Sequence, residues 1–401
     1  MTPFLEALLL QSGYNASLVA IGAGLLGFAA GTAGTFLFLR KRALVSDAVA
    51  HATLPGVTLA FVAMVALGGD GRNLLGLLAG SAATAWIGLV LVDWMARRTR
   101  LSEDAAIGAV LSVFFGIGIV MLTVIQTMSA GRQAGLESFL LGSTAGMLFQ
   151  DAVVIAIGGS LAVLATYVLR RPMTLVAFDP VYAAASGYNV RQIDLAMMGL
   201  VMAVTVIGLK LVGLILIVAM LIIPPVTARF WTDKSAHVIW YAGAIGGFSG
   251  YVGAAISASA RALPTGPIIV LVAAALFLFS LLFAPARGVA AAIIQHRQFQ
   301  RRVHLRQGLL SLARSEKILE PYTIRVLKSE GLARADGVPT DAGRAQAAKI
   351  ARDERRWEIA REIHRDVGLT GRYDGLTPIE DVFTADEIAA FDAHLGGPVA
   401  V

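Results

Sequence analysis

The chain has 401 residues, of which 57% are hydrophobic and only 15% are charged. Soluble globular proteins average about 25% charged residues, so most of this chain is predicted to lie in lipid. It contains no cysteine, which excludes disulfides, thiolate catalysis and zinc-finger sites.

The charge is concentrated at the C-terminal end. Residues 1–286 contain 15 Lys and Arg and 11 Asp and Glu, whereas residues 287–401 contain 18 and 16. This shift predicts a membrane domain over 1–286 and a cytosolic domain over 287–401. Their formal charges are only +4 and +2, which gives little support for nucleic-acid binding. The N-terminus lacks the basic region of a signal peptide and carries Glu6, so the first apolar segment is expected to be retained.

Nine segments approach or reach the roughly 20 apolar residues that a membrane helix needs. They are 17–39, 44–68, 74–95, 106–128, 150–169, 193–209, 211–229, 237–258 and 267–285. The sixth and seventh are short, and a tight hairpin is predicted between them at Lys210. The expected fold is an all-α polytopic membrane protein with about nine transmembrane helices.

Basic residues are distributed unequally between the two sides of these segments. One side has eleven of them: Arg40, Lys41, Arg42, Arg97, Arg98, Arg100, Arg170, Arg171, Arg191, Arg229 and Lys234. The other side has four, namely Arg72, Arg132, Lys210 and Arg261. Because basic loops face the cytoplasm, the N-terminus is predicted outside and the charged C-terminal domain inside.

The loop between Arg171 and Asp194 is predicted to contain a short helix. Asp179 is typical of an N-cap, Pro180 of a first helical position, and Gly187 of a helix end. Two interpretations remain open, an interfacial helix lying on the membrane and a docking element for a cytoplasmic partner.

The second segment begins with RKRALVSDAVAHATLPG and places a carboxylate and an imidazole four residues apart. Asp47 and His51 therefore share one helix face, and Pro55 cannot donate a hydrogen bond to the His51 carbonyl. Ionisable residues inside spans mark ion pathways or sites by default. A mixed nitrogen and oxygen set suits Zn²⁺, Mn²⁺ or Fe²⁺, so this pair is the predicted metal site.

Residue types alone leave a second interpretation of this pair open. Asp47 could cap the helix or be neutralised by Arg40 or Arg42, and His51 could bond to a carbonyl of a neighbouring helix. The membrane domain has only two histidines, His51 and His237. A four-ligand site would therefore need a dimer that supplies the pair twice.

The run FLFLRKRALVSDAVAHATLPGVTLAF resembles the signature of permease subunits of bacterial manganese, zinc and iron ABC importers. Similar stretches follow in the same order: LSEDAAIGAVLSVFFGIGIV, FDPVYAAASGYNVRQID, LKLVGLILIVAMLIIPPVTAR and LPTGPIIVLVAAALFLFSLL. The resemblance covers about residues 17–286.

The resemblance implies a membrane subunit of an ATP-binding-cassette importer in the bacterial cytoplasmic membrane, working as a homodimer or with a second permease. Asp47 and His51 would contact the transported Mn²⁺, Zn²⁺ or Fe²⁺ in passing. A cytoplasmic ATPase dimer would dock at the short helix, and an extracytoplasmic solute-binding protein would deliver the metal. The implied ATPase-coupling residues are Asp179, Pro180, Ala184 and Gly187.

No enzyme activity and no permanently bound cofactor are expected for the chain itself. It has no G-x-x-x-x-G-K-[ST] phosphate-binding loop, so ATP hydrolysis is assigned to the separate ATPase.

The stretch GLARADGVPTDAGRAQAAKIARDERRWE resembles the winged helix and linking helix of iron- and manganese-dependent repressors. A small α+β winged-helix-like domain is therefore expected in the tail. Those regulators have a histidine four residues before the glutamate of the linking helix, whereas here Glu354 stands before Glu358. One interpretation is a regulatory metal site at Glu354, Glu358 and His364, with His304 as a further ligand. The other is a dimerisation or regulatory domain packed against the ATPases.

Three alternative functions fit the sequence less well than the metal permease. A permease for metal chelates such as siderophores or cobalamin is expected to have a wide pathway without a coordinating pair. A secondary transporter usually contains inverted repeats, which the sequence does not show. A membrane-anchored metal sensor would need far fewer spans.

Overall fold

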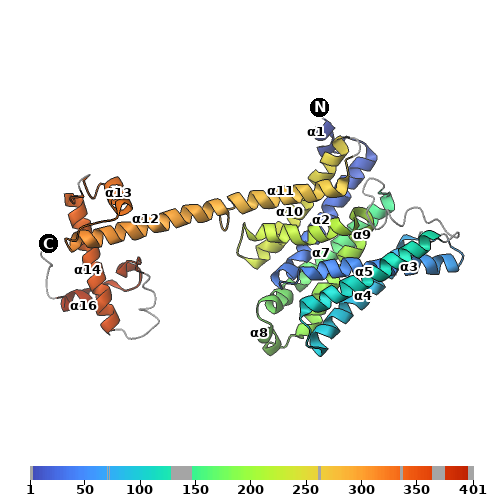
Figure 1. Cartoon of the computed structure of the whole chain (residues 1–401), viewed down its shortest axis with the longest axis horizontal. Helices are drawn as coiled ribbons and strands as arrows, with labels where there is room; N and C mark the ends of the chain where they lie inside the picture. Colours follow the sequence, from blue (N-terminus) through green and yellow to red (C-terminus); the bar gives the residue numbers. More distant parts are fainter. Residues whose placement is uncertain are drawn as a thin grey trace. The chain divides into compact units, whose positions relative to one another are not determined.

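The structure is a computed structural model that describes residues 3–69, 71, 73–127, 147–260, 263–334, 337–363 and 375–395. The described residues are mostly helical (Figure 1). The chain divides into two compact units, residues 1–289 and residues 290–401.

The first unit is a bundle of apolar helices. Its elements are α1 (Pro3–Leu8), α2 (Tyr14–Leu39), α3 (Leu44–Ala66), α4 (Leu74–Arg98), α5 (Glu103–Thr127), α7 (Phe149–Phe178), α8 (Pro180–Ala185), α9 (Val190–Arg229), α10 (Ser235–Ser259) and α11 (Thr265–Phe283). Seven helices among the described residues are long and apolar enough to cross a membrane: α2, α3, α4, α5, α7, the Val190–Leu209 part of α9, and α11. The all-helical polytopic membrane fold is confirmed, and the expected number of nine spans is wrong for the described chain.

Part of this difference arises because α9 is broken at Gly213, whose backbone angles (φ 74°, ψ 172°) are accessible essentially only to glycine. The Ile217 side chain would meet a Cβ placed on Gly208. In a straight helix these residues would lie about 13 Å apart along the axis, so the chain turns back at Gly213. The second arm, Leu216–Arg229, is too short to count as a span.

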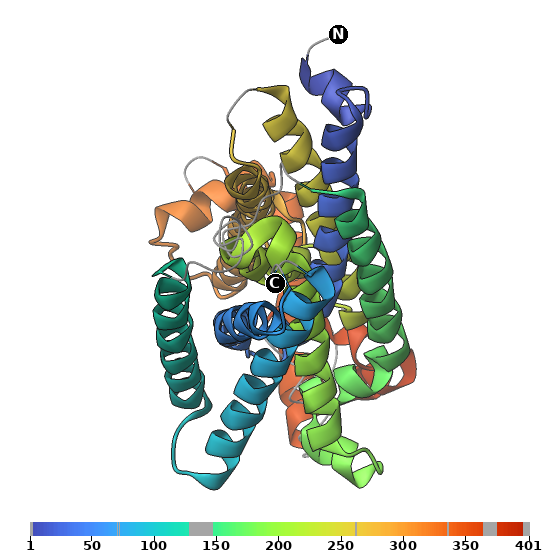
Figure 2. The same ribbon diagram turned by 90° about the vertical axis from the view of Figure 1, so that its right-hand side faces the viewer.

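The eighth predicted segment forms α10, which is not among the seven apolar spans because glycine and serine dilute its hydrophobic residues. The same small residues allow α10 to pack closely on α2. A Cβ on Gly246 would lie 2.2 Å from the Gly27 carbonyl oxygen, and a Cβ on Gly31 would lie 2.2 Å from the Ala242 carbonyl oxygen. Figure 2 shows α7 running beside the other flank of α2, which it also contacts.

The α2–α10 contact predicts a strong effect of adding a side chain. Gly246→Leu is expected to destabilise the protein by more than the about 1–3 kcal/mol typical of overpacking, because the clash is with backbone. Thermal unfolding of the detergent-purified chain measures this effect. Gly116→Leu is the matched control, since a Cβ at Gly116 in α5 meets nothing within 4 Å. Equal melting temperatures for the two variants would contradict the prediction.

The second unit contains α12 (Val289–Ala313), α13 (Pro321–Ser329), α14 (Asp341–Ile363), the 3₁₀ helix η2 (Ile379–Asp381) and α16 (Ala385–His394). One small core gathers Leu309, Leu327 and Leu332. A second is formed by Trp357 of α14 with Phe383 and Phe391, whose rings meet edge to face.

The expected α+β winged-helix domain is not found in the described part of this unit, which has no strand. The segment where a wing would lie has one isolated antiparallel bridge, Ala333 to Pro339. Pro339 has no backbone N–H, so it cannot donate to a strand ladder. Gly331, before the bridge, and Gly337, inside the loop that the bridge closes, take positive φ angles of 71° and 82°, which turn the chain after only a few residues.

An ion pair joins α14 to α16 and predicts a pH dependence. Arg356 donates to Asp392 through Nε (2.7 Å), and this hydrogen bond lowers the pKa of the Asp392 carboxyl below its ordinary value. A lowered folded-state pKa adds stability above the unfolded value of about 3.9, and that stability is lost as the pH falls through the folded value.

We therefore expect Asp392→Asn to reduce hydrogen-exchange protection of α16 in the full chain at neutral pH. The difference from wild type should disappear only as the pH falls through the lowered folded-state pKa of Asp392, since both proteins then lack the carboxylate. A difference that persists unchanged at low pH would contradict the assignment.

Candidate metal pathway and coupling elements

Helix α3 carries the predicted metal pair and is held between α4, α5 and α9. Its crossing with α4 is close, because a Cβ on Gly56 would lie 2.1 Å from the Gly80 carbonyl oxygen. On the α5 side, a Cβ on Gly118 would lie 2.5 Å from the Leu54 side chain. Glycines on both neighbours therefore fix the position of α3 at the level of Pro55.

The structure brings Asp47 and His51 together, as their spacing predicts. His51 Nε2 lies 3.4 Å from Asp47 Oδ1. The side chain of His51 is 19% exposed and that of Asp47 is 39% exposed, so the pair can be reached from outside the single chain. The ring of Phe115 in α5 packs edge to face against the His51 ring, with centroids 4.9 Å apart.

The surroundings of the pair bear on the alternatives that the sequence left open. His51 Nδ1 is buried without a hydrogen-bond partner among the described residues, so no carbonyl of a neighbouring helix occupies it. Arg40 and Arg42 form their ion pairs with Asp194 and Glu103, which leaves the Asp47 carboxylate available. His51 Nε2 beside the partly exposed Asp47 carboxylate fits the donor set of a transition-metal ion.

A single chain provides only part of a coordination shell. Within the described ranges, no group of three or more His, Asp or Glu side chains is placed to hold a metal ion. A divalent ion that meets this pair therefore needs further ligands from water or from another subunit.

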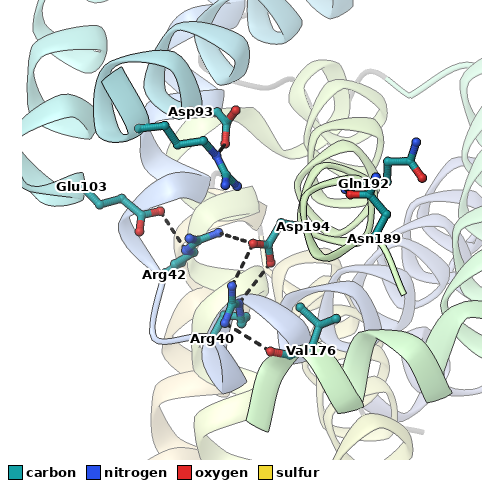
Figure 3. A network of polar contacts seen from close by, with 9 residues as sticks. Arg40, Arg42, Asp93, Glu103, Val176, Asn189, Gln192 and Asp194 are labelled. Atoms are coloured by element: carbon teal, nitrogen blue, oxygen red, sulfur yellow. Dashed lines mark hydrogen bonds and ion pairs between the residues drawn. The ribbon is translucent and has the colours of Figure 1, made fainter. Parts of the chain in front are cut away.

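A second cluster of charged residues lies where α2 and α3 meet the beginnings of α5 and α9 (Figure 3). Arg40 donates to both carboxylate oxygens of Asp194, from Nε at 3.1 Å and from Nη2 at 2.8 Å. It also donates from Nη1 to the Val176 carbonyl at 3.2 Å. Arg42 pairs with Glu103 at 2.8 Å and with Asp194 at 3.6 Å.

Sequence reasoning missed the acidic half of this cluster. It used Arg40, Lys41 and Arg42 to orient the chain and did not assign a partner to Asp194 or Glu103. A usable signal was present, because the membrane domain has only 11 acidic residues and an acidic residue near a span is expected to have a cationic partner.

The short helix predicted in the loop before Asp194 is present as α8. Asp179 is its N-cap and accepts a hydrogen bond from the Tyr182 backbone N–H at 2.8 Å, Pro180 occupies the first turn, and Gly187 follows with φ 88°. Ala184 is exposed, and so are the large apolar side chains of Val181 (79%) and Tyr182 (60%). The role of these residues in contacting an ATPase remains a prediction.

The residues proposed for a regulatory metal site are only partly described. Glu354 Oε2 pairs with Arg306 at 2.7 Å, and Glu358 is exposed. His364 lies outside the described residues. His304 Nδ1 lies 2.9 Å from the Thr323 hydroxyl, and this site stays a prediction. Of the basic residues assigned to the outer side, Arg72, Arg132 and Arg261 also lie outside the described residues.

Comparison with known proteins connects this geometry to a family. Residues 14–284 match the model of the ABC 3 transport family. The manganese transport system membrane protein MntC of Bacillus subtilis is 42% identical over 308 residues, which cover 77% of this chain and 70% of that protein. The zinc transport system membrane protein TroC of Treponema pallidum is 35% identical over 289 residues, which cover 72% and 95%.

A solved structure gives the same result for the fold. The structure of PsaBC from Streptococcus pneumoniae in complex with Fab superposes with a TM-score of 0.61 at 28% identity, over 71% of this chain and 96% of that chain. Both the α3 pair and the α8 segment lie within the matched residues 14–284. The chain therefore belongs to the ABC 3 transport family.

Proposed function

We propose that this chain is the permease subunit of an ATP-binding-cassette importer that moves a divalent transition-metal ion across the bacterial cytoplasmic membrane. The observation that carries the proposal is the Asp47–His51 pair on α3, in which His51 Nε2 lies 3.4 Å from the partly exposed Asp47 carboxylate. The relatives of this chain include manganese and zinc transport membrane proteins, which supports Mn²⁺ or Zn²⁺ as the transported ion. Fe²⁺ suits the same donors.

The pair would act as a transient ligand set. One carboxylate oxygen and one imidazole nitrogen bind a divalent ion without the tight, soft coordination of thiolates. Two copies of the chain, or one copy and a second permease, would present four such groups to the ion. Because the ion must leave again, weak and incomplete coordination suits transport better than a closed site.

The direction of transport follows from the proposed sidedness. The Arg40 end of the bundle would face the cytoplasm, which places the N-terminus outside and residues 290–401 inside. A cytoplasmic ATPase dimer would contact α8, and an extracytoplasmic solute-binding protein would deliver the ion to the opposite face. Closure of the ATPases would then rock the two permease subunits and alternate access to the pair.

The second unit has a less defined role. We propose that residues 290–401 form a cytosolic regulatory or dimerisation domain, with Glu354, Glu358 and His364 as candidate metal ligands. A chain lacking residues 300–401 should still assemble and transport, and would lose only its response to cytosolic metal.

Reconstitution tests the function directly. The chain, its ATPase and its solute-binding protein are placed in proteoliposomes, and uptake of Mn²⁺ and Zn²⁺ is measured with ATP and with a non-hydrolysable analogue. ATP-dependent uptake of either ion supports the proposal. Uptake that continues without the ATPase would indicate a secondary transporter, and selective uptake of a siderophore or cobalamin would indicate a chelate permease.

A further inference from the structure

Asp194 is a buried carboxylate at the start of α9 whose charge is balanced by two arginines from another part of the chain. Its side chain is only 4% exposed. Asp194 accepts two hydrogen bonds from Arg40 and forms an ion pair with Arg42. Separating a buried carboxylate from its cationic partner strongly destabilises the folded protein. Asp194 and Arg40 are therefore expected to move together when either helix is displaced.

Arg40 also holds the other end of the segment that contains α8. Its Nη1 donates to the Val176 carbonyl in the last turn of α7, three residues before the N-cap Asp179. Val176 precedes α8 and Asp194 follows it, so one guanidinium contacts the chain on both sides of this helix (Figure 3). A displacement of α8 would thus reach Arg40 by two routes.

Arg40 and Arg42 belong to the link between α2 and α3, and this link leads directly to Asp47. Lys41 between them has φ 58°, a left-handed conformation that is uncommon for a residue other than glycine and persists where surrounding contacts determine it. Arg42 is further fixed by Glu103 in the first turn of α5. The link is therefore held firmly at both arginines, and α3 begins at Leu44, right after it.

We propose that the contact between Arg40 and Asp194 transmits movement of α8 to the Asp47–His51 pair during ATP-driven transport. The inference rests on the proposed function and adds two positioning residues to it, since neither side chain touches the metal pair. When the ATPases displace α8, Val176 and Asp194 move with it. Because Arg40 is bonded to both, the α2–α3 link and the first turn of α3 follow.

A second buried ion pair provides a matched control. Asp93 in α4 has a side chain 8% exposed and pairs with Arg97 at 2.5 Å and with Arg191 at 3.3 Å. The Arg191 pair joins α4 to α9, the Arg97 pair lies within α4, and neither involves the α2–α3 link. Asp93→Asn thus removes a comparable buried charge without interrupting the proposed connection.

The test measures metal ions transported per ATP hydrolysed by the complete reconstituted complex. Asp194→Asn keeps the size of the side chain and removes its charge, and is expected to lower this ratio about tenfold, within the range typical of coupling between sites. Binding of Mn²⁺ in the absence of ATP and recovery of the ATPase with the permease should stay near wild type. Asp93→Asn should leave the ratio unchanged, and the exchanged double variant R40D/D194R should restore part of it.

The results of these variants either support or overturn the proposed role of the Arg40–Asp194 contact. An unchanged ratio in Asp194→Asn, or an equal fall in Asp93→Asn, would overturn it while leaving the proposed function intact. If the Asp194→Asn complex cannot be recovered, Arg40→Lys, which keeps the charge but cannot make the paired contact with Asp194, is judged by the same ratio. Failure of the wild-type complex to transport metal with ATP contradicts the proposed function and this inference together.

Discussion

Replacing His51 by alanine is expected to lower ATP-driven uptake of Mn²⁺ or Zn²⁺ by about two orders of magnitude. Loss of groups that merely orient a metal ligand already lowers affinity or activity about 10–100-fold, and here one of only two donors in the pair is removed. Asp47→Ala is expected to have an effect of the same size. Uptake is measured in proteoliposomes that contain the complete complex.

The control for this experiment is the other histidine of the membrane domain. His237 near the start of α10 is exposed and contacts Tyr241, so His237→Ala should leave uptake near wild type. Assembly with the ATPase should be the same for all three variants. Nearly normal uptake by both the His51 and the Asp47 variants would show that the ion follows another path.

Placing a charge on α8 is expected to abolish binding of the ATPase. Ala184 is exposed, so Ala184→Glu should not disturb packing of the permease itself. A glutamate in the centre of an interface must lose its water shell without gaining a partner, and one unpaired charge there costs several kcal/mol. Co-purification of the ATPase with the permease from membranes measures the loss.

The matched variant at this position is Ala184→Ser, which adds one small polar atom and no charge. It should retain most of the ATPase, while Ala184→Glu retains almost none. Equal recovery with both variants would mean that the ATPase contacts a different surface. Melting temperatures of the two permeases alone should agree, since neither change reaches a buried group.

Local features of the chain could be predicted well from sequence. The i, i+4 spacing of Asp47 and His51 predicts their contact, because both lie within one regular helix. The N-cap Asp179, Pro180 and the closing Gly187 predict α8 for the same reason. Each of these arrangements depends on residues within one or two helical turns.

Contacts between residues far apart in the sequence could not be predicted from the sequence pattern. Arg40 and Asp194 lie 154 positions apart, and no periodicity relates them. Arg40 or Arg42 was expected as a partner of Asp47 because they are near it in the sequence. In the folded chain, both arginines pair with Asp194 and Arg42 also pairs with Glu103. In the tail, the sequence resembles a winged helix, but Pro339 limits strand pairing where the wing was expected.

The break at Gly213 has a consequence for the topology of the whole chain. Along α2, Leu26 lies near Gly208 and Gly34 lies near Leu221, so the second arm of α9 returns toward the end of the bundle from which the first arm started. Such a re-entrant excursion adds zero net crossings, as a complete hairpin of two spans would. Both ends of α9 therefore lie at the same end of the bundle, although only Val190–Leu209 is long enough to count as a span. The net number of crossings, and not the number of apolar helices, decides on which side the residues after α9 lie.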